Sequence, residues 1–526
     1  MTDATARRGF LNWVERNGNK LPDPAFQFFY FILALVAGSV VADLAGLAVS
    51  HPTEIDPDTG APAKVAAVSL LSTGNIRRLL VEMPQTFTHF HPLGYVLVVM
   101  LGAGVAERSG LFGTAMRAGL RGAPKLLVTP LVVLIAMMGN LAADAGYVVL
   151  IPLAGIVFHA AGRHPIAGIA AAFAGVAGGF SANFVPNQLD ALLFGITEAS
   201  VETAFGDYTA NIAGNWYFIA AMTLIFLPVI WIVTDRIIEP KLGTWDAGRA
   251  EDKLAGPQED RPLTAPEAKG LRHAGFAVLA LCGLWALLLL VPDAPLIDEG
   301  AGPQGRLQPF YQSLIAFFFL LFLLAGWAYG KAVGEITDHR DLIKMMSGAM
   351  ADMAYYLVLA FAAAHFVAMF AWSNLGLILA VLGADVLGSS GLPAWALLAA
   401  IVVASAIINL FIGSASAKWA MLGPVLVPML MLLGISPEMA TAAYRVGDSA
   451  TNIVTPLMPY FPLILIFAQR WDKSFGIGSL TATMLPYSFG LMIAGLAMTI
   501  GWVALDLPLG PGASVLMETL PAAKPD

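Results

Sequence analysis

The sequence Tyr444-Arg445-Val446-Gly447-Asp448-Ser449-Ala450-Thr451-Asn452-Ile453 places an arginine, an aspartate and an asparagine inside an apolar run that extends from 440 to 468. Of the 28 lysine and arginine residues, 26 fall in loops, tails or the edges of apolar runs, and only Lys418 and Arg445 lie inside such runs. A basic residue near the middle of a membrane helix costs roughly 2.5 to 3.5 kcal/mol on insertion scales, so each needs a partner or a polar cavity. Both residues are therefore the first candidates for function.

The composition excludes an ordinary soluble fold. The 526 residues are 58% hydrophobic and 12% charged, whereas about 25% of the residues of a soluble domain are charged. Runs of about 20 apolar residues, long enough for a helix to cross a bilayer core, recur along the chain. We predict an all-α polytopic membrane protein that contacts the lipid bilayer. The net charge of −8 is spread over loops and gives no case for nucleic-acid binding.

Several apolar runs are too long for one span and are interrupted by Gly, Pro, Asn or Ser. Irregular backbone at membrane depth is tolerated only where it faces protein or a water-filled cavity. The interruptions therefore predict two re-entrant helical hairpins, near 166–195 and near 400–433, and helices that are broken at the midplane.

Basic residues predict the orientation, because Lys and Arg in short loops favour the cytoplasm. Seven of them lie between Arg236 and Arg272, and four lie near the N-terminus, whereas the loops 50–88 and 293–309 carry few and should face outward. The predicted order is a cytoplasmic N-terminal segment at 1–25, a first membrane repeat at 26–234, a cytoplasmic linker at 235–271, a second repeat at 272–508 and a C-terminal tail at 509–526.

The two halves share a local pattern. The segment 206–212 matches 447–453 at Gly, Asp, Asn and Ile, and each follows a small-residue turn, at 178–183 and at 413–416. Because the run near 90 enters from outside and the run near 350 from inside, the pattern predicts an inverted repeat, which is typical of secondary transporters. In such folds substrate and coupling ions bind near the midplane, so both matched segments should meet there.

Three stretches carry a resemblance to a known family: 181–190, 414–419 and 444–452. Together they resemble the p-aminobenzoyl-glutamate transporter (AbgT) family, over roughly 20 to 508. The resemblance implies a homodimer in the bacterial inner membrane with about nine full spans and two re-entrant hairpins. It also implies transport of p-aminobenzoyl-glutamate or p-aminobenzoate, or export of sulfonamide antimetabolites. By motif match, the functional positions are Asp190, Ser416, Trp419, Pro437, Arg445, Asp448 and Pro456.

A guanidinium offers a planar fork that binds a carboxylate through two hydrogen bonds, and the implied substrates carry carboxylates. Arg445 is therefore a candidate substrate ligand. The alternative is a structural pair with Asp448, three positions on. Lys418 could help to hold an anion, or could extend to a lipid headgroup. Trp419 could stack on an aromatic substrate, or serve as packing or an interfacial anchor. Ser416 completes the candidate substrate site at the second hairpin.

Asp190 and Asp448 are acids in or beside apolar stretches, so either could carry a proton or contact substrate; Asp190 could equally be a helix cap. Neutral oxygen donors for a bound sodium ion could come from Asn183 and Asn452, with Ser181 and Thr451 beside them; the alternative is that these side chains only satisfy backbone groups at the breaks. No other cofactor is expected. The prolines Pro437 and Pro456 remove backbone donors and would shape the site. A polar island at Asn140, Asp144 and Tyr147 fits a helix cap or a pathway, and His365 fits a core histidine better than a proton carrier.

Rival functions find less support. Ser414 and Ser416 near Lys418 do not have the spacing of a serine and lysine catalytic pair, and no H-E-x-x-H motif occurs, so we predict no enzyme. No repeated filter sequence indicates a channel. The nearest alternative is a sodium-coupled dicarboxylate symporter. The sequence predicts a secondary transporter of aromatic carboxylates but leaves open its direction and whether protons or sodium ions drive it.

Overall fold

The computed structural model describes residues 24–55, 59–120, 127–142, 146–205, 208–246, 262–300, 306–455, 458, 460–517 and 520. Most of the expected N-terminal segment, the middle of the expected linker, and the predicted site residues Asp144 and Pro456 lie outside this part of the chain.

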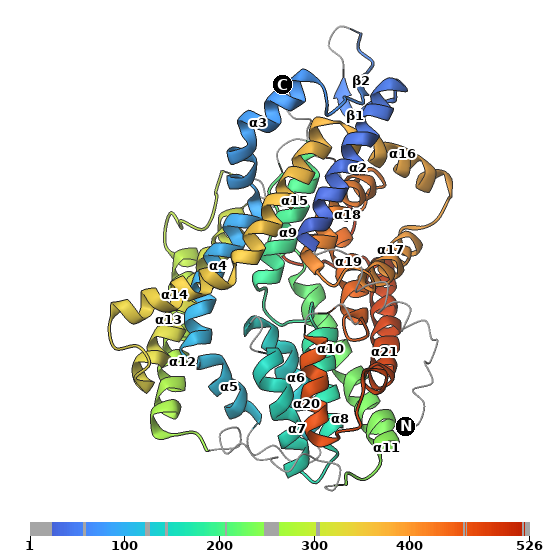
Figure 1. Ribbon diagram of the computed structural model, residues 1–526. Coiled ribbons are helices and arrows are strands. Elements are labelled where there is room, and N and C mark those ends of the chain that lie inside the picture. The colour runs from blue at the N-terminus through green and yellow to red at the C-terminus, as the bar shows by residue number, and fades with distance from the viewer. Residues whose placement is uncertain are drawn as a thin grey trace.

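The described chain is mainly helical (Figure 1). In chain order its elements are α2 (Pro24–Leu44), β1 (Ala48–Ile55), β2 (Pro62–Ala66), α3 (Thr73–Thr88), α4 (His91–Arg108), α5 (Leu111–Leu120), α6 (Val128–Met138), η2 (Gly139–Ala142), η3 (Gly146–Leu150), α7 (Ile151–Ala160), α8 (Pro165–Phe173), η4 (Ala174–Gly178), α9 (Gln188–Glu202), α10 (Trp216–Val233), η5 (Thr234–Ile238), α11 (Glu239–Leu242), α12 (Ala265–Leu290), α13 (Gln308–Val333), α14 (His339–Asp352), α15 (Ala354–Trp372), α16 (Leu375–Ser389), α17 (Ala394–Asn409), α18 (Ala415–Leu432), α19 (Pro437–Thr451), α20 (Phe461–Trp471) and α21 (Ile477–Ala504).

Within the described residues, eight helices are long and apolar enough to cross a bilayer. They begin and end at Ala25–Leu44, Thr73–Arg108, Trp216–Leu242, Ala265–Leu290, Gln308–Val333, Ala354–Trp372, Ala415–Leu432 and Ile477–Ala504. Large apolar side chains on these helices remain exposed, such as Phe276 at 69% and Leu290 at 81%. Exposed apolar surface of this extent suits contact with lipid. The prediction of a polytopic helical membrane protein is confirmed.

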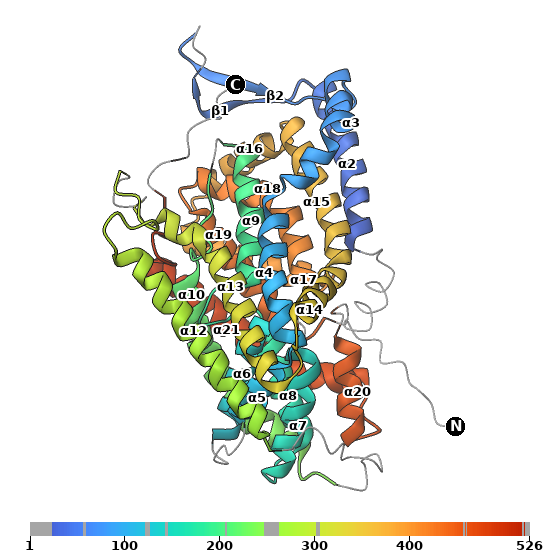
Figure 2. The same cartoon turned by 90° about the vertical axis from the view of Figure 1, so that its left-hand side faces the viewer.

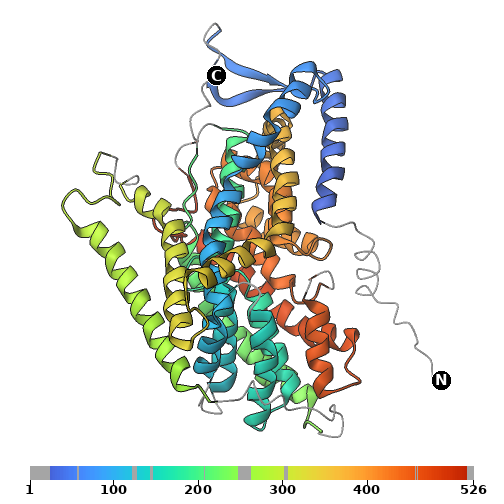
Figure 3. The ribbon, with the colours of Figure 1, turned by 60° about the vertical axis from the view of Figure 1, so that its left-hand side comes forward.

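Two ends of the molecule are distinct. The antiparallel strands β1 and β2, paired from Ala48↔Ala66 to Ile55↔Pro62, lie with α3 at one end, whereas α7 and α11 lie at the other (Figures 1 and 2). The expected outward loop 50–88 thus contains a β-hairpin and a helix. It lies opposite α11, which falls in the expected cytoplasmic linker. Helix α12 packs mainly on α13 and leans outward at one edge (Figure 3).

Helices α17 and α18 are joined by a short turn at 410–414 and form the arms of a helical hairpin. The segment near 166–195, where a hairpin was expected, is arranged differently. Its two pieces, α8 with η4 and α9, lie toward opposite ends of the molecule rather than side by side (Figures 1 and 2). The interrupting residues 179–187 break a path that continues in one direction. The small residues at 179–187 correctly predicted that the helix is interrupted. A broken helix and a hairpin both show small residues inside an apolar run, so the sequence did not distinguish them.

A second paired arrangement precedes that break. Helices α6 and α7 lie together at one end (Figure 1), and Gly139 and Gly146 pack closely between them, since a Cβ on Gly146 would lie 3.3 Å from the Gly139 carbonyl oxygen. In the other half, α19 and α20 are likewise separated by an interruption, at 452–460, and lie at different heights (Figure 1). Each half therefore has a helix pair followed by a broken helix.

Helix α19 is the centre of the fold. Ser436 caps its N-terminus by accepting a hydrogen bond from the Met439 amide, and all residues from Pro437 to Thr451 are buried. Gly447 lets α17 approach, because a Cβ there would lie 2.1 Å from the Val402 carbonyl oxygen. Only glycine permits this backbone contact. The polar side chains of α19 are thereby held away from lipid.

Candidate functional site

The interruption in the first half contacts helix α19 of the second half inside the molecule. The backbone amide of Ser181, in the break that precedes α9, donates to Ser449 Oγ of α19 at 3.2 Å. In the same break, the carbonyl of Gly179 accepts from Asn140 Nδ2 at 3.3 Å. The first-half segment that contacts 447–453 is therefore 179–183. The sequence match predicted that 206–212 would meet 447–453. In the structure Asn211 of that segment instead donates to the Pro511 carbonyl at 2.7 Å. Residues 206 and 207 lie outside the described residues.

Arg445 and Asp190 form a fully buried ion pair. Arg445 Nη1 lies 2.5 Å from Asp190 Oδ1, and each side chain is 1% exposed. The other carboxylate oxygen, Asp190 Oδ2, accepts from the Asn187 amide at 2.7 Å and completes a capping box at the start of α9. Asp190 is thus both a helix cap and an ion-pair partner. The alternative that Arg445 pairs with Asp448 is wrong, because the guanidinium crosses to the other half of the chain.

Donors next to this pair lack partners. Arg445 Nε, Ser181 Oγ and Asn183 Nδ2 are buried and have no hydrogen-bond partner among the described residues. Arg445 Nη2 makes only a long contact of 3.5 Å, to the Ser181 carbonyl. An unsatisfied buried donor costs about 1 to 3 kcal/mol, so such groups need an explanation. Their chemistry suits an anion with several acceptor oxygens.

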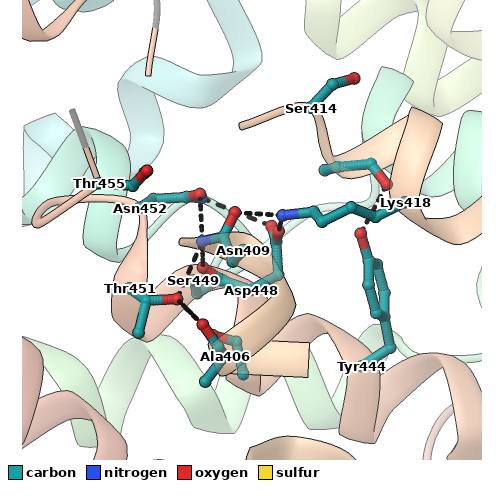
Figure 4. Close-up of polar contacts among 12 residues, drawn as sticks. Ala406, Asn409, Ser414, Lys418, Tyr444, Asp448, Ser449, Thr451, Asn452 and Thr455 are labelled. Carbon is teal, nitrogen blue, oxygen red and sulfur yellow. Dashed lines mark hydrogen bonds and ion pairs between the residues drawn. The ribbon is translucent and has the colours of Figure 1, made fainter. Parts of the chain in front are cut away.

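A second buried ion pair lies one helical turn further along α19, at the tip of the α17–α18 hairpin (Figure 4). Lys418 Nζ contacts both Asp448 Oδ1 and Asn409 Oδ1. Lys418 is 0% exposed and the Asp448 side chain 2%. Lys418 therefore does not extend to a lipid headgroup in this conformation; its charge is compensated inside the protein, as a buried ammonium requires.

Asn409 connects this pair to the break that follows α19. Its Nδ2 lies within hydrogen-bond distance of the Asp448 carbonyl at 2.8 Å, Thr451 Oγ1 at 2.9 Å and Asn452 Oδ1 at 2.8 Å (Figure 4). Sequence reasoning missed this residue. A signal was present, because Asn409 ends an apolar helix directly before the small-residue turn, and Asn140 likewise follows the apolar helix α6, in η2.

The expected sodium ligands are partly engaged. Asn452 Oδ1 accepts from Asn409, and Asn183 Oδ1 accepts from the Val185 amide at 3.2 Å. Thr451 Oγ1 donates toward the carbonyls of Gly447 and Ala406 at 3.1 and 3.2 Å. Of these contacts, only that of Asn183 satisfies backbone at a break, which is the alternative role foreseen for such side chains. Together the contacts also gather oxygen atoms, the donors that hard cations prefer.

Trp419 is packed into the core. It is 0% exposed, its ring stacks on Tyr444 with centroids 4.5 Å apart, and its Nε1 donates to Thr197 Oγ1 at 2.9 Å. Tyr444 in turn donates to the Ala415 carbonyl at 2.5 Å. The structure therefore uses Trp419 to join α18, α19 and α9, and its interfacial role is excluded by burial.

The remaining predicted residues fall near these groups or are structural. Ser416 Oγ lies 3.3 Å from Ser414 Oγ, the N-cap of α18. Pro437 occupies the first turn of α19, where a missing amide costs nothing. His365 is 4% exposed, its Nδ1 donates to the Phe361 carbonyl at 2.7 Å, and its Nε2 has no hydrogen-bond partner among the described residues.

The chain resembles known transporters over most of its length. The model of the AbgT putative transporter family matches residues 9–517. The p-aminobenzoyl-glutamate transport protein of Escherichia coli (strain K12) is 35% identical over 500 residues, which cover 95% of this chain and 96% of that protein.

Two solved structures share the fold. The YdaH transporter of Alcanivorax borkumensis, described as having an unusual topology, aligns with a TM-score of 0.85 and 42% identity, covering 93% of this chain and all of that one. MtrF of Neisseria gonorrhoeae, described as illuminating a class of antimetabolite efflux pumps, aligns with a TM-score of 0.88 and 41% identity over 96% of this chain and all of that one. The family predicted from the motifs is confirmed.

Proposed function

Because the chain belongs to the AbgT putative transporter family, we propose that it is a secondary active transporter of aromatic carboxylates of the p-aminobenzoyl-glutamate and p-aminobenzoate type. Sulfonamide antimetabolites are a further candidate cargo, since one solved relative is described with antimetabolite efflux pumps. The inner membrane of a bacterium is the proposed location, with the N-terminus in the cytoplasm.

The observation that carries this proposal is the fully buried Arg445–Asp190 pair beside unpartnered donors. Arg445 already holds one carboxylate, yet its Nε and the neighbouring Ser181 Oγ and Asn183 Nδ2 remain unsatisfied within the described chain. A substrate carboxylate could accept from these donors, and Arg445 would then share or exchange its charge between substrate and Asp190. Binding and the state of the ion pair would thus be linked.

Ion coupling would act on the same groups. A proton on Asp190 or Asp448 would neutralise one side of a buried pair and release Arg445 or Lys418 to the substrate. A sodium ion held by oxygens of Asn183, Asn452, Ser181 and Thr451 would instead add positive charge at the breaks. Either route makes the affinity for an anionic substrate depend on the ion.

Movement would follow from the interrupted architecture. Broken helices and hairpins at a central site are the elements that alternate access in inverted-repeat transporters. The pairs α6–α7 and α17–α18 are each followed by a broken helix, and an asparagine at each pair contacts that break: Asn140 contacts Gly179 and Asn409 contacts Asn452. This correspondence supports an inverted repeat. We propose that the chain works as a homodimer.

Flux in proteoliposomes tests the proposal. Labelled p-aminobenzoate and p-aminobenzoyl-glutamate would be supplied with proton and sodium gradients imposed separately and in both directions. We expect gradient-driven flux of at least one aromatic carboxylate. Substrate moving against protons establishes antiport; substrate moving with sodium establishes symport.

The control cargo is an aliphatic dicarboxylate. Strictly sodium-dependent flux of succinate with no aromatic flux would replace the proposal by the dicarboxylate symporter. Flux of neither class under any gradient would refute both.

A further inference from the structure

A cavity of about 300 Å³ lies between helices α4 and α15 and the N-terminus of α9. Aromatic side chains from three separate segments line it, namely Tyr147 at the start of η3, Phe180 in the break before α9, and Tyr356 on α15. This volume is at the lower end of the range for small-molecule sites.

The cavity is elongated. Val96 and Glu107 both line it from α4, and eleven helical positions at 1.5 Å each span about 16 Å. Glu107 lies toward one end, together with Asp352, which is bound by Arg108 at 2.5 Å. The start of α9 lies at this same end, because Tyr95 near the other end of α4 donates to Glu198 of α9, so the two helices run in opposite directions.

The cavity reaches the buried ion pair. Asn187 and Gln188 line it at the start of α9, and the Asn187 amide donates to the same Asp190 carboxylate that binds Arg445. Phe180, another lining residue, directly precedes Ser181, whose Oγ lacks a partner within the described chain. A carboxylate at this end would lie near the donors that need an acceptor.

Trp419 cannot supply the ring contact in this conformation. It is 0% exposed and covered by Tyr444. An aryl ligand must therefore find its ring contacts elsewhere. The cavity offers the rings of Phe180 and Tyr356, and Tyr147, one face of which stacks on Tyr460.

We propose that this cavity binds the aryl ring of the substrate, against Phe180, Tyr147 and Tyr356. The carboxylate points toward Asn187 and Arg445. The assignment rests on the proposed function. It adds which residues select an aromatic ligand and in which direction that ligand lies.

The physical basis is stacking and polar matching. Aromatic pairs contribute beyond the burial of area, so the loss of one ring from the wall should weaken an aryl ligand by about tenfold. The unpartnered Arg445 Nε and Ser181 Oγ supply hydrogen-bond donors for the carboxylate at the α9 end.

Calorimetric binding of p-aminobenzoate and benzoate to the purified protein tests this. Phe180→Ala and Tyr356→Leu should each weaken both ligands about tenfold, whereas Tyr356→Phe keeps the ring and should bind normally. Phe317→Ala on α13, which removes a ring that packs on Trp285 away from the cavity, is the matched control.

Leu192→Trp tests the same cavity by filling it, without removing a ring. It should weaken both ligands in a protein that elutes as a folded species. Unchanged affinity in Phe180→Ala, Tyr356→Leu and Leu192→Trp, with normal wild-type binding, overturns this assignment and leaves the proposed function intact. A wild-type protein that neither binds nor transports any aromatic carboxylate overturns both.

Discussion

Asp190 Oδ1 lies 2.5 Å from Arg445 Nη1, so an ion pair joins residues 255 positions apart at the centre of the protein. Asp190 caps the start of α9 in the first half, and Arg445 belongs to α19 in the second half. Each half of the chain therefore supplies the charge that neutralises a buried charge of the other. A change in either charge is therefore transmitted to both halves.

Removing one partner of this pair should be more harmful than removing both. Arg445→Ala leaves Asp190 buried without its cation, which we expect to lower the free energy of unfolding by about 3 to 5 kcal/mol and to abolish transport. The double variant Asp190→Asn with Arg445→Gln should recover most of the stability and none of the transport. Thermal unfolding in detergent and flux assays measure the two effects. Equal stability of the single and double variants would show that the pair is not coupled.

Asn409→Ala should destabilise the α17–α18 hairpin. The substitution removes an acceptor from Lys418 and a donor from Asp448, Thr451 and Asn452. We expect a loss of about 1 to 3 kcal/mol, the cost of leaving buried polar groups unpaired. Gln85→Ala, on the exposed surface of α3, is the control. Comparable melting temperatures for the two variants would remove Asn409 from the network.

Gly447→Ala should prevent α17 from packing on α19. A Cβ at this position would lie 2.1 Å from the Val402 carbonyl oxygen, and backbone cannot give way as a side chain can. We expect poor yield of folded protein or a large drop in melting temperature. Gly275→Ala on α12 meets nothing within 4 Å and should be neutral or stabilising by up to about 1 kcal/mol, because alanine favours helix. Similar behaviour of both variants would contradict the close packing.

Acidification should loosen the β1 segment. Burial lowers the pKa of His51 despite the opposing effect of Glu54, and the neutral Nδ1 accepts from the Glu54 amide at 2.9 Å. Since the pKa is lower in the folded state, the stabilisation is complete above the unfolded value of about 6.5 and is lost as the pH falls through the folded value. Hydrogen exchange at the Thr53 and Glu54 amides should therefore accelerate relative to its intrinsic rate between about pH 7.5 and 5. His51→Gln should show no such pH dependence.

The membrane helices, two site residues and the family could be predicted from the amino-acid sequence. The apolar runs predicted the membrane helices. A helix in lipid must satisfy all its backbone hydrogen bonds within itself, so its sequence is one long continuous apolar run. The cost of charge in lipid marked Lys418 and Arg445, and the motifs at 181–190 and 444–452 indicated the family.

Partner choice was decided by the tertiary structure. Arg445 has Asp448 one helical turn away, yet it pairs with Asp190, while Asp448 pairs with Lys418. The packing of distant segments also decides whether 179–187 reverses the chain or only interrupts a helix. It likewise decides that Trp419 stacks on Tyr444. Sequence determines which groups cannot remain in lipid. Only the fold determines which group compensates them, because ion pairs and stacking act over a few ångströms in space, regardless of separation along the chain.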